Sequence, residues 1–79
     1  MVYPNPAQEI VNVQFYAEEE GEYIIRLIDN IGRTLISKTG NATNGVNTSL
    51  VNTEGIAKGV YHVSIVINEK QQQIILLKN

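Results

Sequence analysis

Apolar and polar residues alternate along most of the chain, in short runs separated by turn-forming residues. Residues 10–15, 22–28 and 60–67 each place apolar side chains at every second position. A period of two is typical of half-buried β-strands, and no stretch shows the period of 3.6 expected of a helix. The pattern predicts a chain of strands whose core is drawn from Val11, Val13, Phe15, Tyr23, Ile25, Leu27, Tyr61, Val63 and Ile65.

Turn signals separate these strands. In the segment 29–32, Asp29 favours the start of a type I turn and Gly32 accepts the left-handed conformation that closes a hairpin. Residues 33–38 are expected to form the returning strand, with Leu35 as its best core candidate, and residues 40–45 a loop. Residues 46–50 predict a short strand, residues 52–58 a crossover anchored inward by Ile56, and residues 68–70 a tight turn. Six to seven short strands spaced in this way predict an all-β, antiparallel, immunoglobulin-like β-sandwich.

The last predicted strand, residues 71–77, differs from the others. It ends in Ile74, Ile75, Leu76 and Leu77, so it is apolar on both faces. A strand of this kind is usually buried on both sides. We therefore expect both faces of this strand to be covered.

Length and composition limit the possible functions. The chain has 79 residues, 43% of them hydrophobic and 18% charged, which indicates one small globular domain. The net charge is −2 and the six basic residues are spread along the sequence, so nucleic-acid binding is not expected. No apolar run approaches the roughly 20 residues of a membrane span. There is no cysteine, so the fold has to rely on packing alone.

The residues offer little catalytic chemistry. His62 is the single histidine, and it falls on the more polar face of its strand, where an exposed or rim position is expected. The acidic cluster of Glu18, Glu19, Glu20 and Glu22 lacks the spacing of a calcium loop and is interpreted as a solvated turn. Tyr16 ends a strand and can be exposed. No catalytic residue, metal site or cofactor is predicted.

Four short motifs follow one another over nearly the whole chain. They are Tyr3-Pro4-Asn5-Pro6, Val11-Asn12-Val13, the hairpin segment 27–33 with Asp29, Gly32 and Arg33, and the segment 56–63 with Gly59 and Tyr61. Their order and spacing resemble the type A C-terminal sorting domain of the type IX (Por) secretion system. The sequence departs from the family near its end. Such domains commonly carry a Lys before the last apolar pair, and this chain has Gln73 at that position.

The resemblance implies an export signal. Such domains are found in Bacteroidetes at the C-terminus of secreted cargo, where the type IX translocon and a surface sortase read them. The cargo passes through the periplasm and the outer membrane, is cleaved upstream of the domain, and remains at the cell surface or is released. We expect the recognised segment to comprise Ile74, Ile75, Leu76, Leu77, Lys78 and Asn79.

Two further expectations concern the domain as a whole. Residues 1–79 are interpreted as a single C-terminal domain excised from a larger secreted protein, with homodimerisation through a strand edge left open. The alternative function is an immunoglobulin-like or fibronectin-like binding or spacer module with a carbohydrate or protein ligand, because a sandwich fold does not specify a function.

Overall fold

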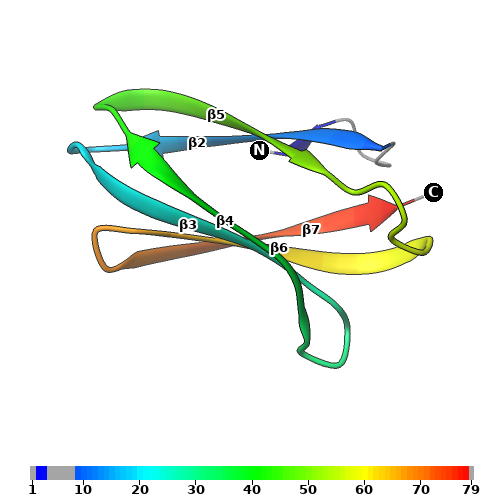
Figure 1. The fold of residues 1–79 in the computed structure, drawn as a ribbon. Coiled ribbons are helices and arrows are strands. Elements are labelled where there is room, and N and C mark those ends of the chain that lie inside the picture. The colour runs from blue at the N-terminus through cyan, green and yellow to red at the C-terminus, as the bar shows by residue number, and fades with distance from the viewer. Residues whose placement is uncertain (1, 4–8, 79) are drawn as a thin grey trace.

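The computed structural model describes residues 2–3 and 9–78, and it is a sandwich of two antiparallel β-sheets (Figure 1). One sheet has the strand order β1-β2-β5, and the other has the order β4-β3-β6-β7. The strands are β1 (Val2–Tyr3), β2 (Ile10–Ala17), β3 (Gly21–Ile28), β4 (Thr34–Ala42), β5 (Gly45–Asn52), β6 (Gly59–Ile67) and β7 (Lys70–Lys78). The all-β sandwich predicted from the sequence is confirmed, and no helix in the described part is long and apolar enough to cross a membrane.

The core lies between the two sheets and is formed by the inward residues of alternating strands. In β6, for example, Tyr61, Val63, Ile65 and Ile67 are buried. Of the nine core positions predicted from residues 10–15, 22–28 and 60–67, all except Tyr23 are buried, and Tyr23 is half-buried against them. Its ring meets that of Phe15 edge to face, with centroids 5.0 Å apart, so it connects the sheets.

Gly40 of β4 makes room for Tyr23. The two residues are direct partners in the β3–β4 ladder. A Cβ atom at Gly40 would lie 2.5 Å from the Tyr23 hydroxyl oxygen and 2.6 Å from the adjacent ring carbon. The ring therefore occupies the space that any larger residue at position 40 would need.

The β4 strand corrects two expectations. It extends to Ala42, although residues 40–45 were expected to be a loop. Leu35 is 39% exposed, so its prediction as a core residue was wrong, and Ile36 packs against the core instead. The register shifts between Leu27 and Ile28, which pair with Ile36 and Thr34, so that Leu35 is left as the extra residue of a bulge.

Hydrogen bonds from two side chains hold the edge strands β4 and β5 and the segment after β5 in place. The Lys38 ammonium group of β4 donates a hydrogen bond to the Leu50 carbonyl oxygen at 2.5 Å, which ties β4 to the β5 edge. Thr53 is fully buried and donates through its hydroxyl to the Glu9 carbonyl oxygen at 2.9 Å. These bonds fix the chain at the point where β5 ends and the crossover to β6 begins.

Candidate recognition surface

The hairpin between β3 and β4 is built around one carboxylate. Asp29 is buried, with 7% of its surface exposed, and its Oδ1 accepts hydrogen bonds from the backbone nitrogens of Ile31 (3.0 Å) and Arg33 (2.8 Å). Its Oδ2 accepts a hydrogen bond from the Arg33 Nε at 2.7 Å. Gly32 adopts a φ of +92°, as the turn signal predicted. The motif residues Asp29, Gly32 and Arg33 thus hold the turn together.

The charge of Asp29 is stabilised by these contacts. Burial by itself would raise the pKa of the Asp29 carboxyl group, but the backbone and side-chain hydrogen bonds from Arg33, together with the Ile31 backbone bond, outweigh it and lower that pKa below 3.8. The Arg33 side chain remains 71% exposed while it makes this contact. Arg33 can therefore support the turn and still face a partner.

The hairpin segment 27–33 is named here the first motif block, and the segment 56–63 the second motif block. The second motif block joins the crossover to the start of β6. The Tyr61 ring is buried, and its hydroxyl donates a hydrogen bond to the Ala57 carbonyl oxygen, four residues upstream, at 2.5 Å. This is the arrangement of the tyrosine corner in immunoglobulin-like sandwiches. Gly59 has a φ of +157° and lies against the Tyr61 ring. Ile56 packs against the core as predicted.

These two motif blocks meet in space, which the sequence did not indicate. They line one open cleft of about 420 Å³ at the end of the sandwich where the crossover lies. Asp29 and Arg33 form one wall, and the segment 55–61 forms the other. Segments more than 20 residues apart in the sequence become neighbours here because the crossover returns the chain to the four-stranded sheet. A hydrophobic pattern carries no signal for such a long-range contact.

The C-terminal strand reaches the same end. In the β6–β7 ladder, Gly59 pairs with Lys78 and Val60 pairs with Leu77. Leu76 is fully buried and Lys78 is 9% exposed, so both belong to the inward face. The segment 74–78 therefore lies beside the second motif block. Asn79 and the motif residues Pro4, Asn5 and Pro6 lie outside the described residues.

The expectation that both faces of the last strand are covered was wrong. On the outward face, Ile75 is 56% exposed and Leu77 is 43% exposed, and Val60 beside them on β6 is 50% exposed. Only the inward face packs on the three-stranded sheet, because the four-stranded sheet has no layer on its other side among the described residues. These three side chains form an exposed apolar strip, named here the outer strip.

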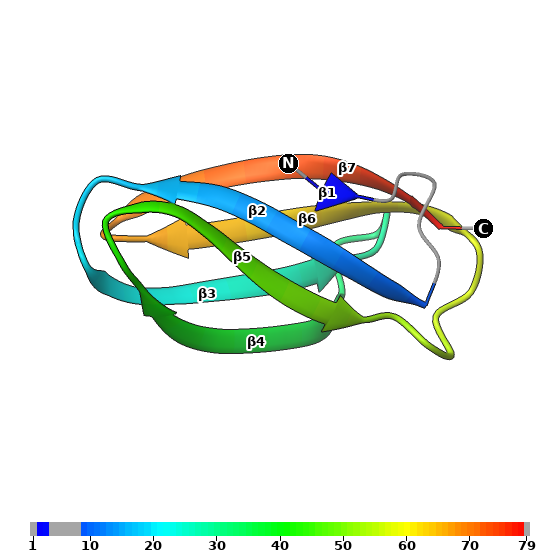
Figure 2. The ribbon, with the colours of Figure 1, turned by 90° about the horizontal axis from the view of Figure 1, so that it is seen from above.

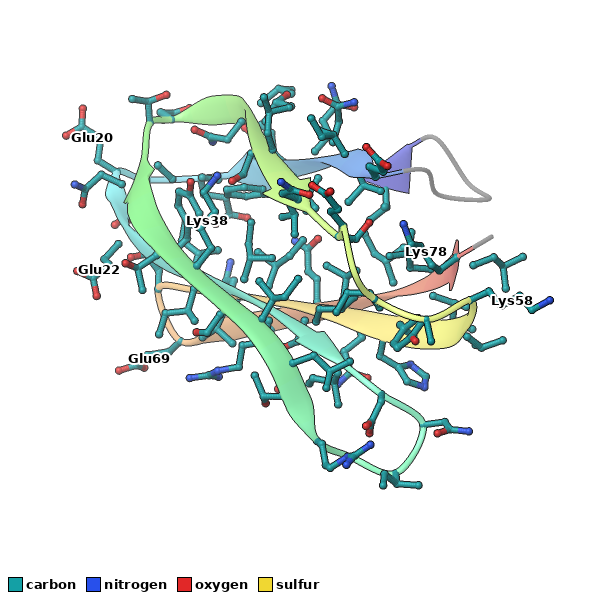
Figure 3. The ribbon with its side chains drawn as sticks, turned by 45° about the vertical axis from the view of Figure 1, so that its right-hand side comes forward. Glu20, Glu22, Lys38, Lys58, Glu69 and Lys78 are labelled. Carbon is teal, nitrogen blue, oxygen red and sulfur yellow. The ribbon has the colours of Figure 1, made fainter. Side chains whose placement is uncertain are left out.

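The opposite end of the sandwich carries the acidic turns. Figure 3 shows Glu20, Glu22 and Glu69 at this end and Lys58 and Lys78 near the other. Glu18 pairs with Lys70 at 3.0 Å, with both side chains largely exposed. Tyr16 is 57% exposed, as the sequence allowed, and lines a second cleft of about 290 Å³.

Little in the described part of the chain suggests catalysis. His62 is half-buried on the outward face, between Ile28 and Ile75 in the register. Within residues 2–3 and 9–78, no three or more His, Cys, Asp or Glu side chains gather in a way that could hold a metal ion.

A comparison with protein families decides the identity. Residues 1–78 match the family described as the secretion system C-terminal sorting domain. The chain belongs to this family. A sorting domain of this kind is a type IX secretion signal, which marks proteins for export across the outer membrane to the cell surface or the medium. Its family is in general non-catalytic, and membership implies interaction with the type IX secretion system. No curated protein matches the sequence.

Proposed function

We propose that the secretion system recognises this sorting domain at the end of the sandwich where the two motif blocks meet, named here the motif end. The domain directs the export of a covalently attached cargo and catalyses no reaction itself. The single observation that supports this proposal is the convergence of the two motif blocks around one cleft, beside which the C-terminal strand pairs with β6. Residues that only maintain a fold would be expected throughout the sandwich. The residues of the two motif blocks instead lie together at one end, beside exposed cations and apolar side chains that a partner can contact.

Each part of this end has a separate role in the proposal. The translocon contacts the outer strip, whose side chains are exposed, and the segment 74–79, which contributes Ile75 and Leu77 to that strip. Arg33 and Lys58 flank the cleft and set the orientation of the partner. A surface sortase then cuts the chain upstream of the domain, and the released cargo is attached to the cell surface. The domain itself is the C-terminal part of a larger exported protein.

The proposal is tested by removing exposed apolar area without disturbing the core. Ile75→Gln combined with Leu77→Gln changes two outward side chains of β7. The matched control is Val46→Gln combined with Leu50→Gln, whose side chains are 66% and 55% exposed on the other sheet. Both variants are fused C-terminally to a reporter in a type IX-competent host, and the reporter on intact cells is quantified.

We expect the β7 variant to lower the surface signal by about tenfold or more, since loss of central apolar contacts commonly costs an interface more than about 1.4 kcal/mol. The control should be exported like the unmodified domain. Melting curves of both purified variants establish that they remain folded. Equal export of the two variants would place the recognised surface elsewhere.

A further inference from the structure

The edge of the three-stranded sheet is only partly filled by β1. Val2 pairs with Val13 and Tyr3 pairs with Asn12. The β2 strand continues to Ala17, and β5 accompanies it on the other side along its whole length. Among the residues that the structure describes, no strand lies beside residues 15–17 on the β1 side.

A cleft occupies this gap. Its volume is about 290 Å³, and it is lined by Tyr16 and Ala17 from β2 and by Ile67, Lys70 and Gln72 from the β6–β7 hairpin. Figure 2 shows that β1 lies over β7. A chain that extended β1 backwards would pass above β7 towards the turn between β2 and β3, and therefore through this cleft.

We propose that the linker joining the cargo to the domain occupies this cleft as a continuation of β1. The proposal rests on the proposed function, because a C-terminal sorting signal has its cargo upstream. The position of the linker follows from the ladder that is already present. In an antiparallel pair, each step along one strand is matched by one step along the other. The three residues that precede Met1 in the exported protein, counted backwards from Met1 as the first, second and third linker residues, then face Phe15, Tyr16 and Ala17 in that order.

The ladder also fixes which linker side chains point inward. Val2 is buried opposite Val13, and side chains alternate along a strand. The first and third linker residues therefore face Phe15 and Ala17 and point between the sheets, where Ile67 lines the cleft. Small or apolar residues fit these two positions. The second linker residue lies outward beside Tyr16.

This arrangement fixes the end of the sandwich at which the linker to the cargo emerges. The cargo leaves the sandwich at the end with the acidic turns, away from the cleft that the two motif blocks line and from the C-terminal end of β7. A protease requires an extended substrate whose backbone is not already paired in a sheet. The surface sortase must therefore cut upstream of the third linker residue while the domain is folded.

Disulfide trapping tests this placement. The domain has no cysteine, so an introduced pair is unambiguous within it. The full-length precursor carries Tyr16→Cys together with a cysteine at the second linker residue. Opposed residues of an antiparallel pair have Cα atoms about 4.5–5.5 Å apart, which is within the range of a disulfide. Mass spectrometry of the cross-linked peptides identifies this bond whatever cysteines the cargo contains.

The matched control carries Val46→Cys with the same linker cysteine. Val46 is the β5 partner of Tyr16, and its side chain is similarly exposed, at 66% against 57%. It lies two strand spacings from the proposed linker, about 9–10 Å, which is too far for a disulfide. We expect at least about a tenfold higher yield with Tyr16→Cys than with Val46→Cys. Melting curves under reducing conditions check that both variants fold.

Equal yields, or no cross-link in either variant, would overturn the placement of the linker. Binding of a carbohydrate in the Tyr16 cleft of the full-length precursor, measured on a glycan array and abolished by Tyr16→Ala, would also overturn it. Export of the same precursors under reducing conditions separates the two proposals. A Tyr16→Cys precursor that is exported under reducing conditions, but does not cross-link when the purified protein is then oxidised, refutes the linker placement alone. A failure of export in the unmodified precursor refutes the sorting function.

Discussion

Tyr61 contributes to stability in two ways that substitution can separate. Tyr61→Ala removes a buried aromatic side chain, a change that costs about 3–5 kcal/mol in other cores. Tyr61→Phe keeps the ring and removes only the hydrogen bond to the Ala57 carbonyl oxygen. Such a bond contributes about 0.5–1.5 kcal/mol net. Ala57 is exposed, so water can replace the lost donor, and we expect about 1 kcal/mol for Tyr61→Phe.

The size of the domain determines what each variant will do. At roughly 0.05–0.15 kcal/mol per residue, a chain of 79 residues has a free energy of unfolding of about 4–12 kcal/mol. Tyr61→Phe should therefore remain folded and melt about 4–8 °C lower. Tyr61→Ala should lose most of the stability, and it is unfolded at 37 °C if the parent lies near the lower limit.

Equilibrium urea unfolding followed by circular dichroism measures both effects. The urea concentration at the midpoint of unfolding should fall. The slope of the unfolding free energy against urea concentration should stay constant, because the same surface is exposed on unfolding. Tyr16→Phe and Tyr16→Ala are the matched controls, since Tyr16 is exposed, and both should change stability by less than about 0.5 kcal/mol. An unchanged midpoint for Tyr61→Phe would show that the corner hydrogen bond contributes nothing. A loss below about 1.5 kcal/mol for Tyr61→Ala would refute the anchoring role of the ring.

Three further changes probe the turns and the sheet. Glu69→Gly should stabilise the domain by about 0.5–1 kcal/mol in thermal unfolding, because position 69 has a φ of +67° in a two-residue hairpin turn that favours glycine; a destabilised variant would contradict this. Gly40→Ala should cost about 1–3 kcal/mol in the urea midpoint, since the new methyl group overlaps the Tyr23 ring, and no change would show that the ring moves freely. The lowered pKa of Asp29 predicts that its contribution to stability is complete above the ordinary value of 3.8 and is lost as the pH falls through the folded-state pKa. Stability measured from about pH 5 to about pH 2 should therefore fall less steeply in Asp29→Asn than in the parent, and parallel curves would contradict that.

The sequence predicted most of the strands because the side chains of a strand alternate between a buried and a solvated face. It failed at Leu35 and Ile36, where two adjacent apolar residues leave the choice of the inward one to the partner strand. The bulge that makes this choice depends on the pairing with β3, and no local pattern records it. The exposure of Ile75 and Leu77 was missed for a different reason. An apolar face indicates that something covers it, but it does not indicate whether the cover belongs to the same chain.

The candidate site was predictable only in parts. The hairpin of Asp29 and Gly32 and the core position of Tyr61 followed from turn chemistry and alternation. Their meeting around one cleft did not, because the crossover of residues 53–58 brings them together through contacts across more than 20 residues. The contribution of β7 to the same end also depends on its pairing with β6.

The fully buried Leu76 links the stability of the domain to the shape of one of its ends. It lies in β7, and without it the core between the sheets is left with a gap. The same strand pairs with Gly59 and Val60 of β6, beside the cleft that the two motif blocks line. A change that detaches β7 would therefore remove core packing and alter this end of the sandwich at the same time.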